Sequence, residues 1–267
     1  MDVVDEVRLH GGAMPRSRLP RRQVERALAA GLLVAPRRGV VALPDLPMEQ
    51  MTALRLGGVL SCASAAVVLG LDLIDEPARP HVTVPRGTRV PMQAAAVVHR
   101  RDVPSLELTT SLSRTAADCA RCLPAVHGLV VVESALRSGL SAGEIEQHLW
   151  GRGCGDALAL VRRADARAGS SGETVARVTL QAEGLQVEPQ VFIAGVGWVD
   201  LLVEGRVVVE IDGFAYHSDR SQFAKDRRRD AQLTAMGYVV VRFTWLDAVR
   251  RPDYLVSTVR QLVALAS

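Results

Sequence analysis

The stretch WVDLLVEGRVVVEIDG, Trp198–Gly213, predicts a β-hairpin that collects acidic side chains at one end. Glu204-Gly205-Arg206 fits a three-residue hairpin loop in which Gly205 takes the left-handed conformation. That loop places Asp200 opposite Glu210, and cross-strand partners have Cβ atoms ~4.5–5.5 Å apart. Because side chains alternate along a strand, one face is expected to carry Asp200, Leu202, Val208, Glu210 and Asp212, and the other the apolar Val199, Leu201, Val203, Val207, Val209 and Ile211. One face therefore packs against a core, while the other brings carboxylates together.

These acids predict a metal site. Carboxylates on adjacent, otherwise apolar strands repel one another unless a cation lies among them. Hard oxygen ligands suit Mg²⁺ or Mn²⁺, and such a metal can stabilise the charge of a phosphate during hydrolysis. The alternative is a solvated strand end whose acids pair with Arg228 or Arg229.

The segments around the hairpin predict a mixed sheet with helices on its faces. We expect helices over Glu173–Glu183, Ser221–Met236 and Pro252–Ala266, and further strands over Val187–Ile193 and Tyr238–Thr244. A Gly/Ser-rich stretch, Arg167–Gly172, is typical of a linker. Residues 166–267 are therefore predicted to form one domain, and the whole chain belongs to the α/β (α+β) class.

The sequence Trp198–Trp245 resembles the nuclease-like domain related to very-short-patch repair endonucleases, in the PD-(D/E)xK superfamily, and the resemblance extends over about Ser170–Leu265. It implies that Asp200 is the first metal-binding aspartate and Glu210 the second acid, with the carbonyl of Ile211 as a further metal ligand. By the same resemblance Glu173 is the acid on the preceding helix. His217 is the histidine that can accept a proton from water.

Other positions match or depart from that pattern. Asp226, Arg229 and Leu233 match its D-x-x-R-x-x-x-L helix, and Arg242 matches the arginine of the last strand. We expect Arg228, Arg229 and Arg242 to contact DNA. Val199 stands where a proline usually precedes the first aspartate, and Asp212 stands at the lysine position, so His217 would have to orient the water. The mismatch-specific insertion of the repair enzymes is not recognisable, so their T:G specificity is not implied.

Residues 1–46 predict a winged helix-turn-helix. The expected order is a helix that contains Val3 and Val7, a short helix or turn over Met14–Leu19, a helix over Arg21–Ala30, and strands over Leu32–Ala35 and Val40–Leu43. Gly12–Leu43, notably RRGVVALP, resembles the winged-helix domain of abortive-infection-type antitoxins. Because such a domain places one helix in the major groove and a hairpin tip over the backbone, the candidate DNA contacts are Arg21, Arg22, Arg26, Arg37 and Arg38. The alternative is an ordinary solvated basic face.

Residues 47–165 are predicted to form an antitoxin-like α/β middle domain. Helices are expected over Met51–Leu71, Ser111–Leu123, Val126–Ser138 and Ser141–His148, the last with a Ser141/Glu144 capping box, and strands over Pro80–Pro85 and Ala95–Arg100.

The C-x-x-C of Cys119 and Cys122 lies in that middle segment. It lacks a second ligand pair for zinc and lies inside a helical pattern rather than at a strand-to-helix turn. Both thiols are therefore expected to be buried and structural. The histidines His10, His81, His99 and His148 are expected to have ordinary structural roles.

The composition limits the classes of protein to which the chain can belong. The chain has 267 residues, 48% hydrophobic and 23% charged, which excludes extensive disorder. Its apolar runs are too short for a membrane span, and Met1–Arg8 carries acids and no apolar run, unlike a signal peptide. A cytoplasmic location is expected, with no membrane partner. Four cysteines do not indicate a disulfide scaffold.

The leading functional hypothesis is a Mg²⁺- or Mn²⁺-dependent DNA endonuclease, active in repair or defence and positioned on DNA by the winged helix. The first alternative is a non-catalytic DNA-binding regulator with a decayed nuclease domain. The second is an antitoxin for a protein partner that the sequence does not identify.

Overall fold

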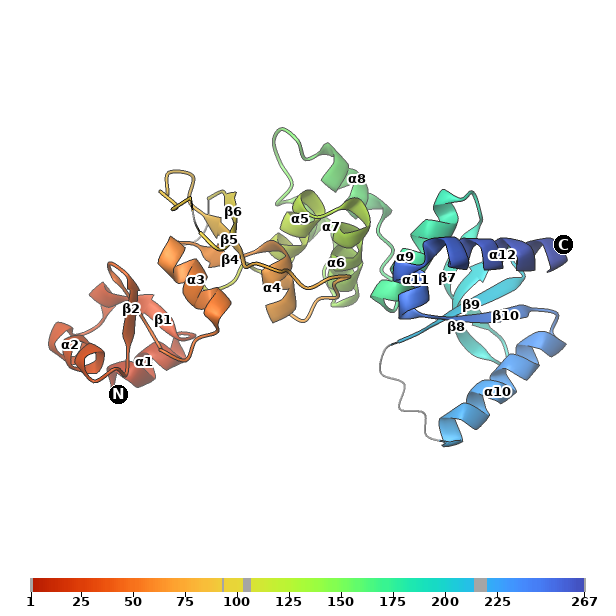
Figure 1. Ribbon diagram of the computed structural model, residues 1–267, viewed down its shortest axis with the longest axis horizontal. Coiled ribbons are helices and arrows are strands. Elements are labelled where there is room, and N and C mark those ends of the chain that lie inside the picture. The colour runs from red at the N-terminus through yellow and green to blue at the C-terminus, as the bar shows by residue number, and fades with distance from the viewer. Residues whose placement is uncertain (1, 93, 103–106, 214–219, 267) are drawn as a thin grey trace. The chain divides into compact units, whose positions relative to one another are not determined.

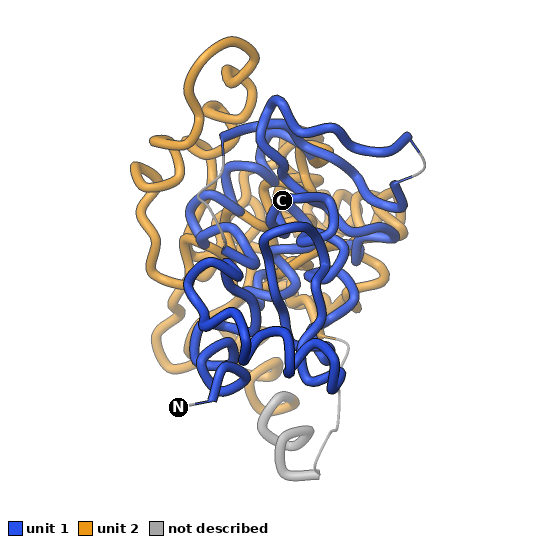
Figure 2. Tube along the Cα trace, turned by 90° about the vertical axis from the view of Figure 1, so that its left-hand side faces the viewer, with its two compact units in different colours: residues 1–71, 75–122 blue, residues 72–74, 123–267 orange. Residues whose placement is uncertain are grey.

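The computed structural model describes residues 2–92, 94–102, 107–213 and 220–266, with side chains in the last range from Arg227 onward. Contacts divide the chain into two units (Figure 2). Unit 1 contains residues 1–71 and 75–122, and unit 2 contains residues 72–74 and 123–267. The architecture is mixed α/β, as predicted. The division into 1–46, 47–165 and 166–267 remains a prediction.

The first part of unit 1 is a small helical and three-stranded structure. Its elements are α1 (Val3–Leu9), β1 (Ala13–Pro15), η1 (Arg16–Arg18), α2 (Arg21–Ala29), β2 (Val34–Arg37) and β3 (Val40–Ala42). The antiparallel sheet has the order β1-β3-β2. The segment expected as a short helix or turn thus begins as a strand, because Met14 pairs with Val41, and only its second half forms a single 3₁₀ turn.

The second part of unit 1 contains a three-stranded sheet and three helices. Its elements are α3 (Met48–Leu56), β4 (Val59–Leu60), α4 (Cys62–Val68), β5 (His81–Val84), β6 (Val97–Arg100) and α5 (Leu112–Cys122). The order is β4-β5-β6, with β4 antiparallel and β6 parallel to β5.

The expected single helix over Met51–Leu71 is wrong. Gly57 ends α3 with φ +75°. A Cβ on Gly58 would lie 2.3 Å from the carbonyl oxygen of Thr83. These two glycines let the backbone turn and approach β5, so a strand pairs where a helix was predicted.

Unit 2 begins with four helices, α6 (Ala125–Arg137), α7 (Ala142–Glu146), α8 (Gly155–Arg163) and α9 (Ser171–Ala182). The predicted capping box of Ser141 and Glu144 is present at the start of α7. Glu133 of α6 is fully buried, accepts a 2.6 Å hydrogen bond from Thr174 and pairs with Arg177, both of α9. This buried polar contact fixes α9, which carries one of the predicted acids.

The remainder of unit 2 is a four-stranded mixed sheet with helices on both faces (Figure 1). Its elements are β7 (Val187–Ile193), β8 (Gly197–Val203), β9 (Val207–Asp212), α10 (Arg220–Ala235), β10 (Val239–Thr244), α11 (Trp245–Arg250) and α12 (Pro252–Ala266). The order is β10-β9-β8-β7, with only the β10–β9 pair parallel.

Each face of this sheet has its own core. One core joins Ile211 and alternate strand valines to α9, α11 and α12, including Leu180 and Leu255. The other joins Leu202 and Val208 to Leu233 of α10. No helix among the described residues has the length and apolarity that crossing a membrane requires.

Candidate active site

The hairpin of β8 and β9 has the predicted register. Leu201 pairs with Val209, Leu202 with Val208 and Val203 with Val207. Beyond these pairs, the backbone N–H of Ile211 donates a 2.8 Å hydrogen bond to Oδ2 of Asp200. Asp200 is thereby held across from the end of β9, where Glu210 is only 5% exposed.

Glu173 reaches the same place from α9. Ser170 caps this helix by accepting a 3.2 Å hydrogen bond from the backbone N–H of Glu173. The Glu173 carboxylate accepts 2.8 Å hydrogen bonds from the Gly169 backbone and from the side chain of Gln190. Nε2 of Gln190 also lies 3.4 Å from Oδ1 of Asp200. Gln190 therefore links the helix acid to the strand acid.

Gln190 was not anticipated from the sequence. It has φ +51°, an uncommon conformation for a residue other than glycine. The available signal was Pro189 in mid-strand, since proline in a strand marks an edge or a bulge, and β7 is an edge strand here.

The predicted face of Val199 is wrong. Val199 packs in the same cluster as Leu202 and Val208, although it lies an odd number of residues from both. The strand alternation therefore breaks beside Asp200, opposite the distorted backbone at Gln190.

Burial and mutual repulsion raise the pKa values of the acids. Burial is the main cause for Glu173, and the charge of Asp200 adds to it. Burial also raises the pKa of Asp200, against the hydrogen bond from Ile211. For Glu210, burial and the Asp200 charge raise the pKa to about 7, although Arg229 and Arg242 oppose the shift. Near neutral pH, a cation that binds among these three acids therefore stabilises their ionised forms.

Two of the predicted DNA-contacting arginines lie against acids. Arg229 pairs with Oε1 of Glu210 at 3.1 Å and donates to the carbonyl of Trp198. Arg242 lies 3.4 Å from Asp212 and 2.9 Å from Asp230. The alternative to a metal site was a solvated strand end whose acids pair with Arg228 or Arg229. The pair with Arg229 is present, but Glu210 is buried rather than solvated.

The arginine does not fully satisfy Glu210. Its buried Oε1 makes no hydrogen bond within the described part of the chain, because the contact with Arg229 lacks hydrogen-bond geometry. A buried carboxylate oxygen that has an ion pair but no hydrogen bond is only partly compensated for the loss of its water.

The remaining predicted residues are placed as follows. Asp212 is half-buried at the end of β9, and Arg228 is exposed on α10. His217 and the side chain of Asp226 lie outside the described residues. In unit 1, the five arginines Arg21, Arg22, Arg26, Arg37 and Arg38 are all exposed, and Arg21 forms a 2.9 Å ion pair with Glu25.

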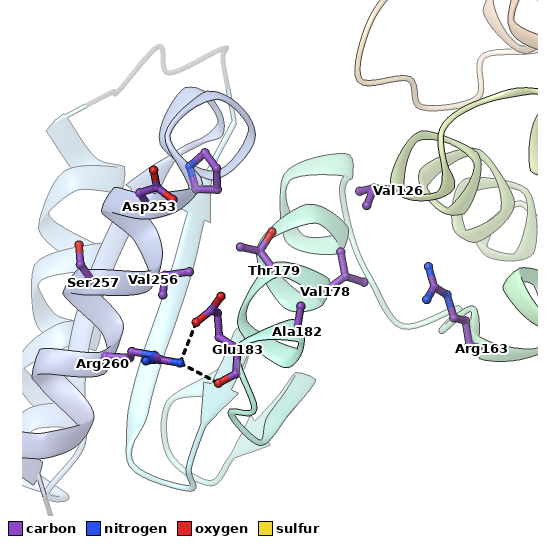
Figure 3. Close-up of a pocket in the computed structure, with 11 residues that line it drawn as sticks. Val126, Arg163, Val178, Thr179, Ala182, Glu183, Asp253, Val256, Ser257 and Arg260 are labelled. Carbon is purple, nitrogen blue, oxygen red and sulfur yellow. Dashed lines mark hydrogen bonds and ion pairs between the residues drawn. The ribbon is translucent and has the colours of Figure 1, made fainter.

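A separate groove of about 660 Å³ lies between α9 and α12 (Figure 3). Arg260 crosses it and donates to both the backbone carbonyl and the carboxylate of Glu183. Glu183 is ten residues after Glu173, about 15 Å along a helix. The groove is therefore not part of the acid cluster.

Comparison with known proteins supports a nuclease-like domain in unit 2. A model of the restriction-endonuclease-like family REase_MTES_1575 matches residues 173–263, a range that contains Glu173, Asp200, Glu210 and Asp212. Two relatives from Mycobacterium tuberculosis are "Uncharacterized protein MT2308" of strain CDC 1551 / Oshkosh and "Uncharacterized protein Rv2248" of strain ATCC 25618 / H37Rv. Each is 29% identical to this chain over 267 residues, 90% of this chain and 96% of the relative.

A solved structure also shows partial similarity. The crystal structure of the RV2827C protein from Mycobacterium tuberculosis matches 66% of this chain and 78% of its own, at 20% identity and a TM-score of 0.35. A TM-score this low does not establish a shared fold.

Proposed function

We propose that this protein is a Mg²⁺- or Mn²⁺-dependent endodeoxyribonuclease that hydrolyses phosphodiester bonds. The observation that supports this most is the state of Glu210. It is a buried carboxylate with a pKa raised to about 7, held beside Asp200, and its Oε1 has an ion pair with Arg229 but no hydrogen bond. The restriction-endonuclease-like family match over the same residues supports the reaction class.

The residues present fit a divalent cation. Asp200, Glu210 and the carbonyl of Ile211 would hold it, and their oxygens are the ligands that Mg²⁺ and Mn²⁺ prefer. When bound, the metal supplies Lewis-acid stabilisation of charge on a scissile phosphate. Arg229 and Arg242 compensate part of the negative charge of the acids. A phosphate of the DNA that enters the site would compete with the carboxylates for both arginines.

Other side chains position these groups and handle the proton. Gln190 holds Glu173 and Asp200 together through its two amide contacts. His217 follows Asp212 by five residues and is our candidate for accepting the proton of the attacking water, since histidine titrates near neutral pH. It replaces the lysine that the superfamily carries at the Asp212 position.

The basic N-terminal segment is the proposed DNA-positioning element. Its exposed arginines on α2 and on the β2–β3 turn are arranged for contact with a groove and with the phosphate backbone. A winged helix of this kind would bind DNA at any sequence through phosphate contacts and would bring unit 2 to its substrate.

The deciding experiment is incubation of the full chain with labelled duplex, single-stranded, branched and modified DNA. We expect cleavage in Mg²⁺ or Mn²⁺, none in EDTA, and products with a 5′-phosphate. The Gln190→Ala variant, purified in parallel, should cleave more slowly because Glu173 and Asp200 lose their shared donor. Metal-dependent cleavage of equal rate in both preparations would mean that Gln190 does not contribute to cleavage.

A second candidate is a DNA-binding regulator without catalysis. The ion pairs of Arg229 and Arg242 with the acids favour it, because they compensate the carboxylates without a metal. DNA binding together with no cleavage of any DNA form in either metal would establish this function instead.

A further inference from the structure

Four side chains of types that bind metals converge in unit 1. They lie in a different part of the sequence from the acids discussed above and offer sulfur and nitrogen instead of oxygen. They are Cys62, His81, His99 and Cys122, and one ligand atom of each lies within 4.8 Å of all the others. Each comes from a different element. Cys62 begins α4, His81 begins β5, His99 lies in β6 and Cys122 ends α5.

The sheet brings the two histidines to the same face. In the parallel pairing of β5 and β6, His81 lies beside Val97 and Thr83 beside His99. His99 is thus two residues beyond the direct neighbour of His81, and residues two apart on a strand share a face. Nδ1 of His81 and Nε2 of His99 are 3.2 Å apart.

The backbone at the start of α4 is tied to β5 on both sides of Cys62. The N–H of Ser61 donates to the carbonyl of His81 at 3.0 Å, and the N–H of His81 donates to Oγ of Ser64 at 2.9 Å. Cys62 itself is fully buried and has φ +49°. A left-handed conformation outside glycine is strained, and such strain concentrates at functional positions.

The distances fit a tetrahedral ion. Zinc bonds of about 2.0–2.1 Å to nitrogen and 2.3 Å to sulfur separate two nitrogen ligands by about 3.3 Å, and a nitrogen and a sulfur by about 3.6 Å. The nitrogens of His81 and His99 are 3.2 Å apart, and Sγ of Cys122 lies 3.8 Å from Nε2 of His99. These two separations are close to those of a tetrahedral zinc site, and all four ligand atoms lie within 4.8 Å of one another.

We propose that Cys62, His81, His99 and Cys122 bind a structural zinc ion. Two thiolates and two imidazoles form a closed set, which leaves no open position for a substrate and selects zinc over Mg²⁺. The ion would join the start of α4 and the end of α5 to the β5–β6 pair. Its binding free energy would then contribute to the folding of unit 1.

The structure bears on two expectations from the sequence. Cys122 is exposed rather than buried, so it is not a second core thiol of the C-x-x-C. His81 and His99, which were expected to have ordinary structural roles, lie within hydrogen-bond distance of one another. Cys119, which is fully buried, is not among the converging ligands.

The test is metal content of the full chain produced with zinc in the medium and purified under reducing conditions. We expect one zinc ion per chain by elemental analysis. After removal by a strong chelator, added Co²⁺ should give the intense visible absorption of a tetrahedral thiolate site, and Zn²⁺ should abolish that absorption. The zinc-loaded chain should also melt at a higher temperature than the stripped chain.

Matched variants identify the ligands. Cys122→Ala changes an exposed residue at a helix end and should lose stoichiometric zinc and the Co²⁺ spectrum. Cys119→Ala changes the other cysteine of the C-x-x-C and should keep both, as should Asp200→Asn in unit 2.

Several outcomes would overturn the proposal. One is wild-type protein that carries no zinc and gives no thiolate absorption with Co²⁺. Another is equal zinc loss in Cys119→Ala and Cys122→Ala, which would indicate a C-x-x-C site. Should Cys122→Ala fail to fold, stripping and reloading of the wild type still decides the question.

Discussion

The acid cluster of unit 2 and the Cys/His cluster of unit 1 are candidate metal sites of opposite chemistry, assembled by opposite routes. The first takes hard oxygens from two strands joined by one short loop, with Glu173 added from the preceding helix. The second takes sulfur and nitrogen from four elements spread between Cys62 and Cys122. A local pattern in the sequence can therefore reveal the first, whereas only the fold brings the second together.

The two sites also differ in what balances their charge. Arg229 and Arg242 already pair with the acids, so a divalent ion there competes with guanidinium groups and can exchange. A set of four protein ligands encloses its ion and holds it more firmly. The two sites should accordingly select different metals, and the predictions below separate them further.

The largest expected effect is that of Asp200→Asn. The substitution keeps the shape of the side chain and removes a charge at the proposed metal site, so cleavage should fall to background. DNA binding should stay intact or become tighter, because the site repels phosphate less. Labelled-DNA cleavage and binding assays measure the two effects, and zinc content should stay unchanged.

Glu183→Gln is the matched control for that variant. Glu183 is the C-cap residue of the helix that carries Glu173, but it pairs with Arg260 in the separate groove, so its loss should leave cleavage unchanged. Metal-dependent cleavage by a clean Asp200→Asn preparation would remove Asp200 from the site.

The next effect in size is that of His217→Ala, which tests the proposed proton acceptor. General-base catalysis contributes roughly 10²–10⁴ in rate, so the variant should lose about that factor. It should also lose the dependence of the rate on a group that titrates near ~6.5. Single-turnover rates across a pH series measure both, with His10→Ala as the control. A normal rate and an unchanged pH profile would mean that water is activated without His217.

Glu210→Gln should change stability in a pH-dependent way. The folded chain keeps the Glu210 proton up to about pH 7, whereas the ordinary value is 4.5. Between these values the folded state binds more protons than the unfolded state, so this group makes the free energy of unfolding fall as pH rises. At about 1.4 kcal/mol per pKa unit, the variant should be more stable than wild type by up to about 3 kcal/mol above pH 7, and no more stable below pH ~4.

Denaturant unfolding in metal-free buffer measures this difference. Added Mg²⁺ should narrow it, because the metal favours the ionised carboxylate of the wild type. Glu188→Gln, an exposed acid on β7, should show no comparable trend. A wild-type stability that rises between pH 5 and 7 relative to Glu210→Gln would contradict the raised pKa.

The contrast between the two sites also explains how much of the structure could be predicted from the sequence. Strand alternation and one turn glycine were sufficient for the register of Leu201–Val209 and its neighbours, because these contacts are local. Gln190 was missed because its role depends on a distorted backbone. The helix expected over Met51–Leu71 failed because Gly58 packs against Thr83, a contact made only in the fold. The Cys/His cluster was not predicted because sequence patterns for zinc sites rely on pairs of ligands at short spacing, and these four ligands are far apart in the sequence.

The smallest predicted effect concerns the N-terminal arginines, and it tests whether unit 1 has a DNA-binding role besides the proposed zinc site. Arg22 on α2 and Arg38 on the β2–β3 turn are both exposed. If each contacts one phosphate, Arg22→Ala or Arg38→Ala should weaken binding at every DNA sequence and reduce the magnitude of the salt slope by ~0.9. Titrations at several salt concentrations measure the slope. Arg8→Ala, an exposed arginine on α1 that pairs with Asp5, is the control and should leave the slope unchanged. Equal slopes in all three variants and wild type would mean that unit 1 does not contact phosphate through these residues.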